Sequence, residues 1–170
     1  MWKICDITWA EGQRFFRGRT VYFEAMSSMI DLESFGRNLN VAVFGATGGI
    51  GKALTLSFST NPNTKSIYAI SRSINEYPSP KITSLQVDIG NEHDIVRVAK
   101  AVKSIVSELH IVLVATGILH VGDDIKPEKS WRALDRISME AVFRVNAIGP
   151  ALVAKPFLPL LAQNRKSVFA

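Results

Sequence analysis

Short apolar runs alternate with longer amphipathic runs along most of this chain. Apolar runs of about four to eight residues predict strands, and apolar residues that recur every three or four positions predict helices. The strand-like runs are Leu39–Phe44, Ser66–Ile70, Ile82–Val87, His110–Ala115 and Ser167–Ala170. The helix-like runs are Ile50–Ser59, a stretch that begins at Asn91, and Ser138–Gln163. This alternation predicts an α/β fold with a doubly wound parallel sheet and right-handed crossovers.

Particular residues indicate where the second predicted helix begins and where the third is irregular. Asn91 is a favourable N-cap, and the acidic residues Glu92 and Asp94 suit the positive end of a helix dipole. The run Ser138–Gln163 contains Gly149-Pro150 and two later prolines. Because proline removes a backbone donor and crowds the preceding turn, we expect this helix to be kinked or broken there.

The first 38 residues do not share this pattern. They contain Trp2, Trp9 and a mixed aromatic and basic cluster, Arg14–Arg19. Val21–Leu32 has the spacing of a short helix, but the charges of the segment balance and its periodicity is poor. The segment is either an arm that packs on the domain or a partner, or a leader that is not native to it. We favour the leader, with the domain covering residues 39–170.

The most informative stretch joins the first predicted strand to the first predicted helix. It reads Gly45-Ala46-Thr47-Gly48-Gly49-Ile50-Gly51. Gly45 would turn the chain off the strand, a middle glycine would let the backbone approach a pyrophosphate, and Gly51 would let the helix pack closely. This is the dinucleotide-phosphate signature of a Rossmann-like fold, although a purely structural turn looks the same. A P-loop is excluded because alanines, Ala46 and Ala53, stand where it needs glycine and a hydroxyl.

Ligands in such a sheet bind at the carboxyl ends of the strands. Ser71 and Arg72 follow the second predicted strand, and no acidic residue precedes Glu76 to accept a hydrogen bond from a ribose 2′-hydroxyl. The planar fork of Arg72 suits a 2′-phosphate, so this stretch favours NADP over NAD. The alternative is a solvated arginine on a loop.

Candidate cofactor contacts also follow the third and fourth predicted strands. Asp88 would hold the amino group of an adenine while Ile89 covers the ring, unless Asp88 caps the following helix instead. Ala115-Thr116-Gly117 is small enough for the backbone to pass close under a nicotinamide ribose, or is a simple turn.

Asn146 stands inside the last predicted helix among apolar residues. Asparagine is a poor interior helix residue, so we expect it to face inward and to find partners, bridging the kink at Pro150 or anchoring a water. The three histidines, His93, His110 and His120, lack the spacing of metal ligands, so no metal site is predicted.

Composition and charge narrow the functional classes. The 170 residues suit one domain, and 47% hydrophobic with 21% charged residues is ordinary for a globular protein. A single cysteine, Cys5, excludes an intrachain disulfide. The net charge of +5 is scattered, which disfavours a nucleic-acid partner and suits an anionic cofactor. No uncharged apolar run approaches membrane-spanning length and acidic residues interrupt the N-terminus, so we expect a cytoplasmic protein with no membrane partner.

Together these motifs resemble the short-chain dehydrogenase/reductase family from Leu39 to Ala170. The similar stretches are the glycine turn, the adenine-contacting pair Asp88-Ile89, Ala115-Thr116-Gly117 for the family's Asn-Ala-Gly motif, and Asn146 for the asparagine of its catalytic set. Ala115 stands where asparagine is usual. Thr116–His120 and Pro127–Lys129 further resemble the C-factor-like, cell–cell signalling subgroup.

The resemblance implies an oxidoreductase that transfers a hydride between a nicotinamide cofactor and a small carbonyl or alcohol substrate. NADP(H) is favoured over NAD(H) as that cofactor. In that family a serine orients the carbonyl, a tyrosine donates the proton, and a lysine lowers the pKa of the tyrosine. These residues lie beyond the fifth strand, and no Tyr-x-x-x-Lys pair occurs near the C-terminal end of this chain. We therefore expect an N-terminal portion that is inactive alone and a homo-oligomer in full-length form. The alternative is a non-catalytic NADP(H)-binding sensor or regulatory module.

Overall fold

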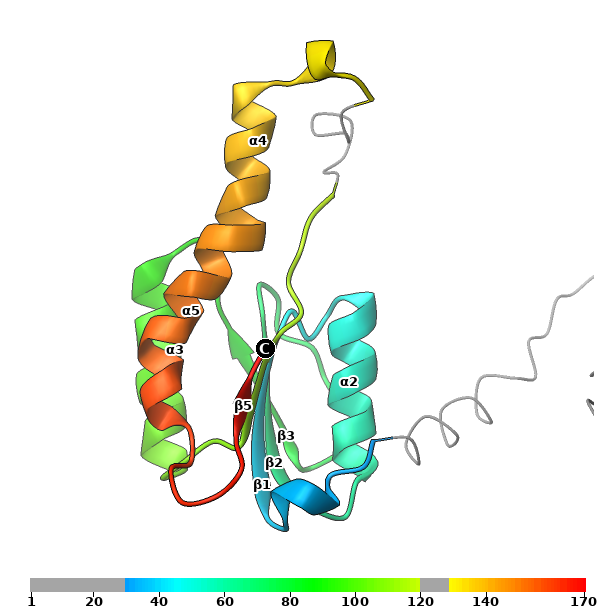
Figure 1. The fold of residues 1–170 in the computed structure, drawn as a ribbon. Coiled ribbons are helices and arrows are strands. Elements are labelled where there is room, and N and C mark those ends of the chain that lie inside the picture. The colour runs from blue at the N-terminus through cyan, green and yellow to red at the C-terminus, as the bar shows by residue number, and fades with distance from the viewer. Residues whose placement is uncertain (1–29, 120–128) are drawn as a thin grey trace, which may run out of the picture.

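A five-stranded parallel sheet forms the centre of the molecule (Figure 1). The computed structural model describes residues 30–119 and 129–170. The strands lie in the order β3-β2-β1-β4-β5. Their bounds are β1 Leu39–Phe44, β2 Thr64–Ser71, β3 Ile82–Gln86, β4 Ile111–Val114 and β5 Val168–Phe169. The predicted α/β fold is confirmed, with every predicted strand present to within a few residues.

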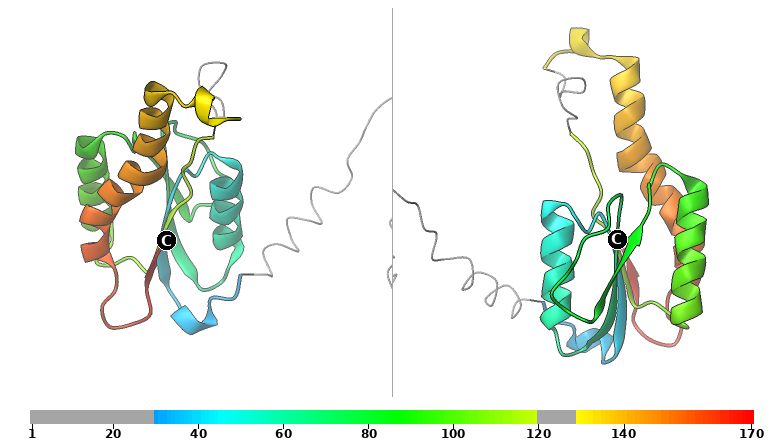
Figure 2. Two further views of the ribbon diagram at one scale, coloured as in Figure 1. Left: turned by 45° about the horizontal axis from the view of Figure 1, so that its top comes forward. Right: turned by 180° about the vertical axis from the view of Figure 1, so that it is seen from behind.

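Helices cover both faces of the sheet (Figures 1 and 2). Helix α2, Gly49–Thr60, lies on one face. Helices α3, Glu92–Ile105, and α5, Gly149–Phe157, lie together on the other. As predicted, Asn91 caps α3, because its side chain accepts a hydrogen bond from the His93 amide.

Alternate residues of β1 pack into the two layers of the core, one on each face of the sheet. Val41 and Val43 belong to the cluster under α2, and Phe44 belongs to the cluster under α3 and α5. The rings of Phe44 and Phe157 meet edge to face with 5.0 Å between centroids. All six residues of β1 are buried, as expected of a parallel strand that is covered on both faces.

Residues 30–38 pack on this core. Leu32 is buried in the α2-side cluster, within a short segment that includes the 3₁₀ turn Glu33–Phe35. The side-chain amide of Asn61 donates to the Ile30 carbonyl at 3.0 Å, and Lys166 donates to the Ser34 hydroxyl at 2.9 Å. Trp2, Trp9, Arg14–Arg19 and most of Val21–Leu32 lie outside the described residues, so the boundary at residue 38 stays a prediction.

The last predicted helix is continuous rather than broken. It comprises α4, Arg136–Phe143, a π-helical turn, Arg144–Ile148, then α5 and a 3₁₀ turn, Leu158–Leu160. Within the π-helical turn the Gly149 amide donates to the Arg144 carbonyl, five residues back. Pro150 cannot continue an α-helical ladder, and the wider turn directly before it absorbs that defect.

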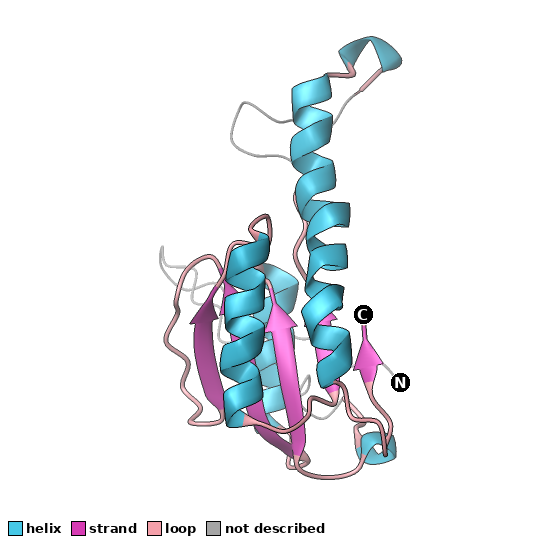
Figure 3. Cartoon of the chain, turned by 90° about the vertical axis from the view of Figure 1, so that its left-hand side faces the viewer, coloured by secondary structure: helices cyan, strands magenta, loops and turns pink. Residues whose placement is uncertain are grey.

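Helix α4 projects beyond the carboxyl ends of the strands (Figure 3). Several of its apolar side chains are exposed. Ile137 and Phe143 are 69% and 56% exposed. By length and composition alone, the stretch Arg136–Leu160 would be able to cross a membrane. Because Glu140, Arg144 and Lys155 lie in this stretch, it is not an uncharged run of the kind that the sequence analysis excluded. A single helix of this kind is weak evidence for a membrane.

Candidate functional site

A pocket of about 190 Å³ opens where the carboxyl ends of β1, β2 and β4 meet the loop after β3. The predicted residues that line it are Gly45, Thr47, Gly48, Ser71, Arg72, Asp88, Ile89, Ala115, Thr116 and Gly117. Gly49, Ile50 and Gly51 lie in the first turn of α2 and do not line this pocket. The rule that ligands bind at strand ends thus gathers most of the candidates at one place.

Two glycines are required by the backbone of the turn after β1. Gly45 has a φ of +77°, and a Cβ on it would lie 2.7 Å from the carbonyl oxygen of Ala115. A Cβ on Gly51 would collide with the carbonyl oxygen of Gly45. Gly49 differs, because its Cβ would meet nothing within 4 Å. The close packing of strand, turn and helix therefore depends on Gly45 and Gly51.

The N-terminus of α2 is left open for a ligand. Its N-cap is Gly48, which has no side chain to accept from the first amides, and no acidic residue lies in the first turn. The first-turn amides and the positive end of the helix dipole favour an anion at this point. Because Gly48 also lines the pocket, this end of the helix borders the pocket.

Arg72 lies at the start of the connection from β2 to β3, which has neither helix nor strand. Its carbonyl accepts from the Gln86 amide at 2.9 Å, and the Ser71 hydroxyl donates to the Ser73 carbonyl at 2.7 Å. These bonds fix the backbone around Arg72, while its side chain is exposed at the pocket.

Asp88 does not cap α3. Its carboxylate accepts from the Gly90 amide at 2.9 Å and thereby holds a tight turn, while Asn91 takes the cap. This corrects the alternative interpretation of Asp88. The residue lines the pocket next to Ile89, as the cofactor interpretation requires.

Asn146 is exposed, so the expectation that it is buried is wrong. The helix leaves the sheet near this residue and little of the chain covers it. Its Oδ1 accepts from the Ile118 amide at 2.8 Å, and its Nδ2 donates to the Ile118 carbonyl at 2.8 Å. The side chain thus clamps the loop after β4, whose residue Thr116 has a buried hydroxyl without a partner among the described residues.

One Tyr-x-x-x-Lys spacing does occur, at Tyr77 and Lys81, and sequence reasoning missed it. The two side chains contact different parts of the molecule. The Tyr77 hydroxyl donates to the Ala46 carbonyl at 2.9 Å, and Lys81 donates to the Asn61 carbonyl at 3.1 Å, beyond the far end of α2. They do not converge on the pocket and so do not form a proton-donating pair.

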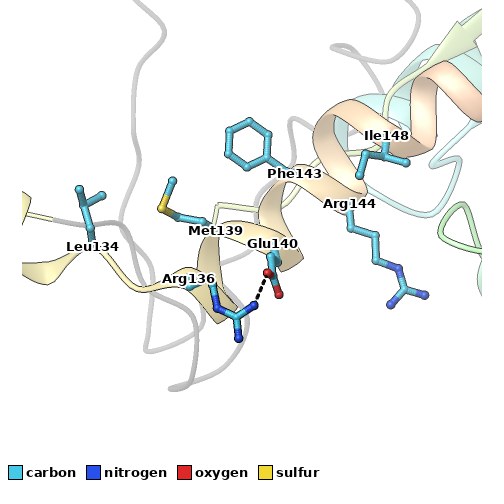
Figure 4. A pocket seen from close by; sticks show the side chains of 7 residues that line it. All are labelled: Leu134, Arg136, Met139, Glu140, Phe143, Arg144 and Ile148. Carbon is cyan, nitrogen blue, oxygen red and sulfur yellow. Dashed lines mark hydrogen bonds and ion pairs between the residues drawn. The ribbon is translucent and has the colours of Figure 1, made fainter.

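A larger hollow of about 540 Å³ lies on α4 (Figure 4). Its lining is mostly apolar and comes from a single helical stretch with Leu134 beside it. Its Arg136 and Glu140 pair with each other at 2.8 Å, and Phe143 stands beside them. No predicted site residue lines this hollow, and convergent polar groups are missing from it. We therefore assign the candidate site to the strand-end pocket.

Comparisons with known proteins agree with this geometry. Residues 39–168 match the sequence profile described as short chain dehydrogenase. No curated protein matches the chain. Residues His120, Pro127 and Glu128, on which the subgroup resemblance partly rests, lie outside the described residues.

Several solved structures share the fold. NADPH-bound carbonyl reductase from chicken fatty liver is 20% identical with a TM-score of 0.63, over 73% of this chain and 48% of that one. A short-chain dehydrogenase from Streptomyces avermitilis is 18% identical with a TM-score of 0.60, over 72% of this chain and 44% of that one. Thermoplasma acidophilum aldohexose dehydrogenase is 19% identical with a TM-score of 0.58, over 74% of this chain and 45% of that one.

This chain spans about half the length of these solved relatives. At such low identities the structural likeness establishes the fold alone. The match to the family profile covers most of the chain and includes the glycine turn and the strand ends that form the pocket. The chain belongs to the short-chain dehydrogenase family.

Proposed function

We propose that this chain is the cofactor-binding half of an NADP(H)-dependent oxidoreductase that acts on a carbonyl or alcohol substrate. One observation carries the proposal: the glycine turn, Arg72, Asp88 and the loop after β4 line a single pocket at the carboxyl edge of the sheet. That combination suits a ligand with phosphates at one end and an adenosine at the other.

The residues present fit such a cofactor. Gly48 leaves the turn without a side chain where the open N-terminus of α2 meets the pocket. Asp88 and Ile89 offer an acceptor and an apolar surface side by side, which suits an adenine ring. When bound, the cofactor supplies or accepts a hydride. The residues of this chain bind and orient it, and Asn146 fixes the backbone of the loop after β4.

The pocket is small for a whole dinucleotide. Its 190 Å³ falls below the roughly 300 to 1,000 Å³ of complete small-molecule sites. A site that has only its cofactor-side walls would have this size. In the full-length family pattern the serine and the Tyr-x-x-x-Lys pair supply the other half, so we expect no turnover from residues 1–170 alone. We further propose a homo-oligomeric, cytoplasmic full-length protein of the C-factor-like subgroup.

A second candidate function is an NADP(H) sensor without catalysis. It is favoured by the same pocket together with the position of Tyr77 and Lys81, which do not converge on it. Sequence beyond residue 170 separates the two candidates. A downstream serine and Tyr-x-x-x-Lys pair favours the enzyme, and a continuation without them favours the sensor.

The Arg72→Ala variant tests the choice of cofactor. A charge-assisted hydrogen bond to a 2′-phosphate contributes enough that its loss should weaken NADPH binding at least about tenfold. Binding of NADH, which has no 2′-phosphate, should change less than about twofold. Isothermal titration of both cofactors measures this, with Arg132→Ala as control, because Arg132 is exposed outside the pocket. Equal weakening of both cofactors would contradict the role given to Arg72.

A further inference from the structure

A tyrosine from the β2–β3 connection reaches the glycine turn. Parallel strands are usually joined through a helix, but the 72–81 connection has none and is fastened by side chains instead. Tyr77 lies in the middle of this connection and packs against the α2-side core. Its hydroxyl donates to the carbonyl of Ala46, which is fully buried. Burial raises the pKa of Tyr77, so the hydroxyl keeps the proton that it donates.

The geometry of one peptide group links this contact to the pocket. All described peptide bonds are trans, so the Ala46 carbonyl and the Thr47 amide point in opposite directions. With the carbonyl held toward Tyr77, the Thr47 amide points away from it. Thr47 lines the pocket and Tyr77 does not. The Thr47 amide thus points away from Tyr77 and belongs to a residue that lines the pocket.

Little else holds this peptide group. Among the described residues, the Thr47 amide has no protein acceptor, and the Ala46 carbonyl accepts only from Tyr77. The preceding peptide groups are held separately, since the Gly45 and Ala46 amides both donate to the Ile70 carbonyl, at 2.8 and 3.3 Å. The Ala46–Thr47 peptide lies inside a turn that the Gly48 amide closes by donating to the Gly45 carbonyl at 2.9 Å, and the bond from Tyr77 is the one described hydrogen bond that this peptide group makes itself.

We propose that Tyr77 is a positioning residue of the cofactor site, whose hydroxyl orients the Ala46–Thr47 peptide so that the Thr47 amide is presented to a phosphate group. This inference rests on the proposed function, because the phosphate belongs to the cofactor. Tyr77 does not touch the ligand. It acts through the turn, and its role is independent of Arg72, which recognises the 2′-phosphate.

The Tyr77→Phe variant removes only the hydroxyl and keeps the packing of the ring. With one orienting hydrogen bond lost, we expect the Kd values of NADPH and NADH to rise together by about fivefold. The ratio between the two cofactors should stay constant, because Arg72 is untouched. The matched control is Ser84→Ala, which removes the bond from Ser84 to the Asn75 carbonyl and loosens the same connection without affecting Ala46. That control should keep both Kd values within about twofold.

A spectroscopic readout follows the amide itself. In ¹H–¹⁵N spectra, inorganic pyrophosphate added to the wild-type chain should shift the Thr47 amide strongly, and in Tyr77→Phe this shift should fall by at least about half. A merely structural role for Tyr77 would lower the melting temperature without changing this shift. A wild-type Thr47 amide that does not respond to pyrophosphate would overturn the inference, even if the variant failed to fold.

The remaining outcomes separate this inference from the proposed function. If the folded wild type binds NADPH and Tyr77→Phe binds it equally well, the inference is wrong and the proposed function stands. Equal weakening in Tyr77→Phe and Ser84→Ala would also overturn it, because loosening of the connection would then explain both. If the wild type binds neither cofactor, the proposed function fails, and the pyrophosphate titration alone decides the role of Tyr77.

Discussion

At the scale of single residues, the glycines of the turn after β1 differ in how well they tolerate replacement by alanine. Gly45 combines a φ of +77° with a backbone oxygen 2.7 Å from where a Cβ would lie. The Gly45→Ala variant should therefore lose about 2 kcal/mol or more of unfolding free energy, from backbone strain and steric conflict together. Urea denaturation followed by circular dichroism measures this loss.

The control is Gly49→Ala, two residues from the pocket-lining Thr47. A Cβ at Gly49 meets nothing within 4 Å, and alanine is a better helix former than glycine. We expect its unfolding free energy to lie within about 0.5 kcal/mol of wild type or slightly above. If both variants lost the same stability, the distinction between a strained and an open glycine would be wrong.

Where a local rule applies, the sequence alone predicts which candidate residues lie close together. Arg72 directly follows β2 and Asp88 lies two residues after β3, and both line the pocket because the carboxyl ends of parallel strands meet at one end of the sheet. No local rule predicts the role of Tyr77, because its contact with Ala46 joins residues 31 positions apart in the sequence. The apolar neighbours of Asn146 predict that it faces inward. It is exposed instead, because the helix leaves the sheet near this point.

At the scale of elements, the long helix and the loop after β4 are coupled through Asn146. Its two hydrogen bonds to Ile118 join segments 28 residues apart. In Asn146→Ala the Ile118 amide loses its acceptor, so its hydrogen exchange should accelerate at least about tenfold. Because the site is exposed, global stability should fall by no more than about 1 kcal/mol.

Asn146→Asp is the matched variant. It keeps an oxygen that accepts from the Ile118 amide and replaces the donor to the Ile118 carbonyl with a charged oxygen that repels it. Exchange of that amide should lie between wild type and Asn146→Ala. If the amide exchanged at the wild-type rate in both variants, the clamp would have no role in holding the loop.

The elements themselves are predictable to within a few residues, but the π-helical turn is not. Pro150 marks the place of the irregularity from sequence. The form that it takes depends on packing, since Gly149 lies so close to Ile89 that a Cβ would come within 2.9 Å of that side chain. Contacts between segments 60 residues apart leave no local signal in the sequence.

At the scale of the whole molecule, a buried histidine links stability to pH. His110 is only 2% exposed, and its Nδ1 accepts from the Asn40 amide at 3.0 Å, which joins β4 to the start of β1. Burial lowers the pKa of His110, and the positive charge of Arg165 lowers it further, against an opposing effect of Glu108. Protonation would place two donors face to face, so the neutral ring is the folded form.

Because the folded-state pKa is depressed, the unfolded chain takes up the proton first as pH falls. The unfolding free energy should therefore decrease below pH 6.5, by up to about 1.4 kcal/mol for each pH unit, down to the folded-state pKa. Chemical denaturation at pH 7.5 to 5 measures this. His110→Asn, whose Oδ1 replaces the Nδ1 acceptor and does not titrate, should flatten the profile. An unchanged slope in the variant would assign the effect to other groups.

We expect the exposed face of α4 to promote association. Ile137 and Phe143 are large, apolar and exposed on the projecting helix, and such patches promote self-association. We expect concentration-dependent association in sedimentation velocity, which the Ile137→Lys, Phe143→Lys double variant should reduce. Ile74→Lys, at a side chain 65% exposed in the β2–β3 connection, is the control and should leave association unchanged. A wild-type chain that stays monomeric at about 100 μM would contradict the expectation.

The most direct test of the central claim is a titration of the purified, folded chain with NADPH, followed by its fluorescence. We predict saturable binding that 2′,5′-ADP competes away and that is tighter than binding of NADH. A chain that melts cooperatively and yet binds neither NADPH nor NADH would contradict it.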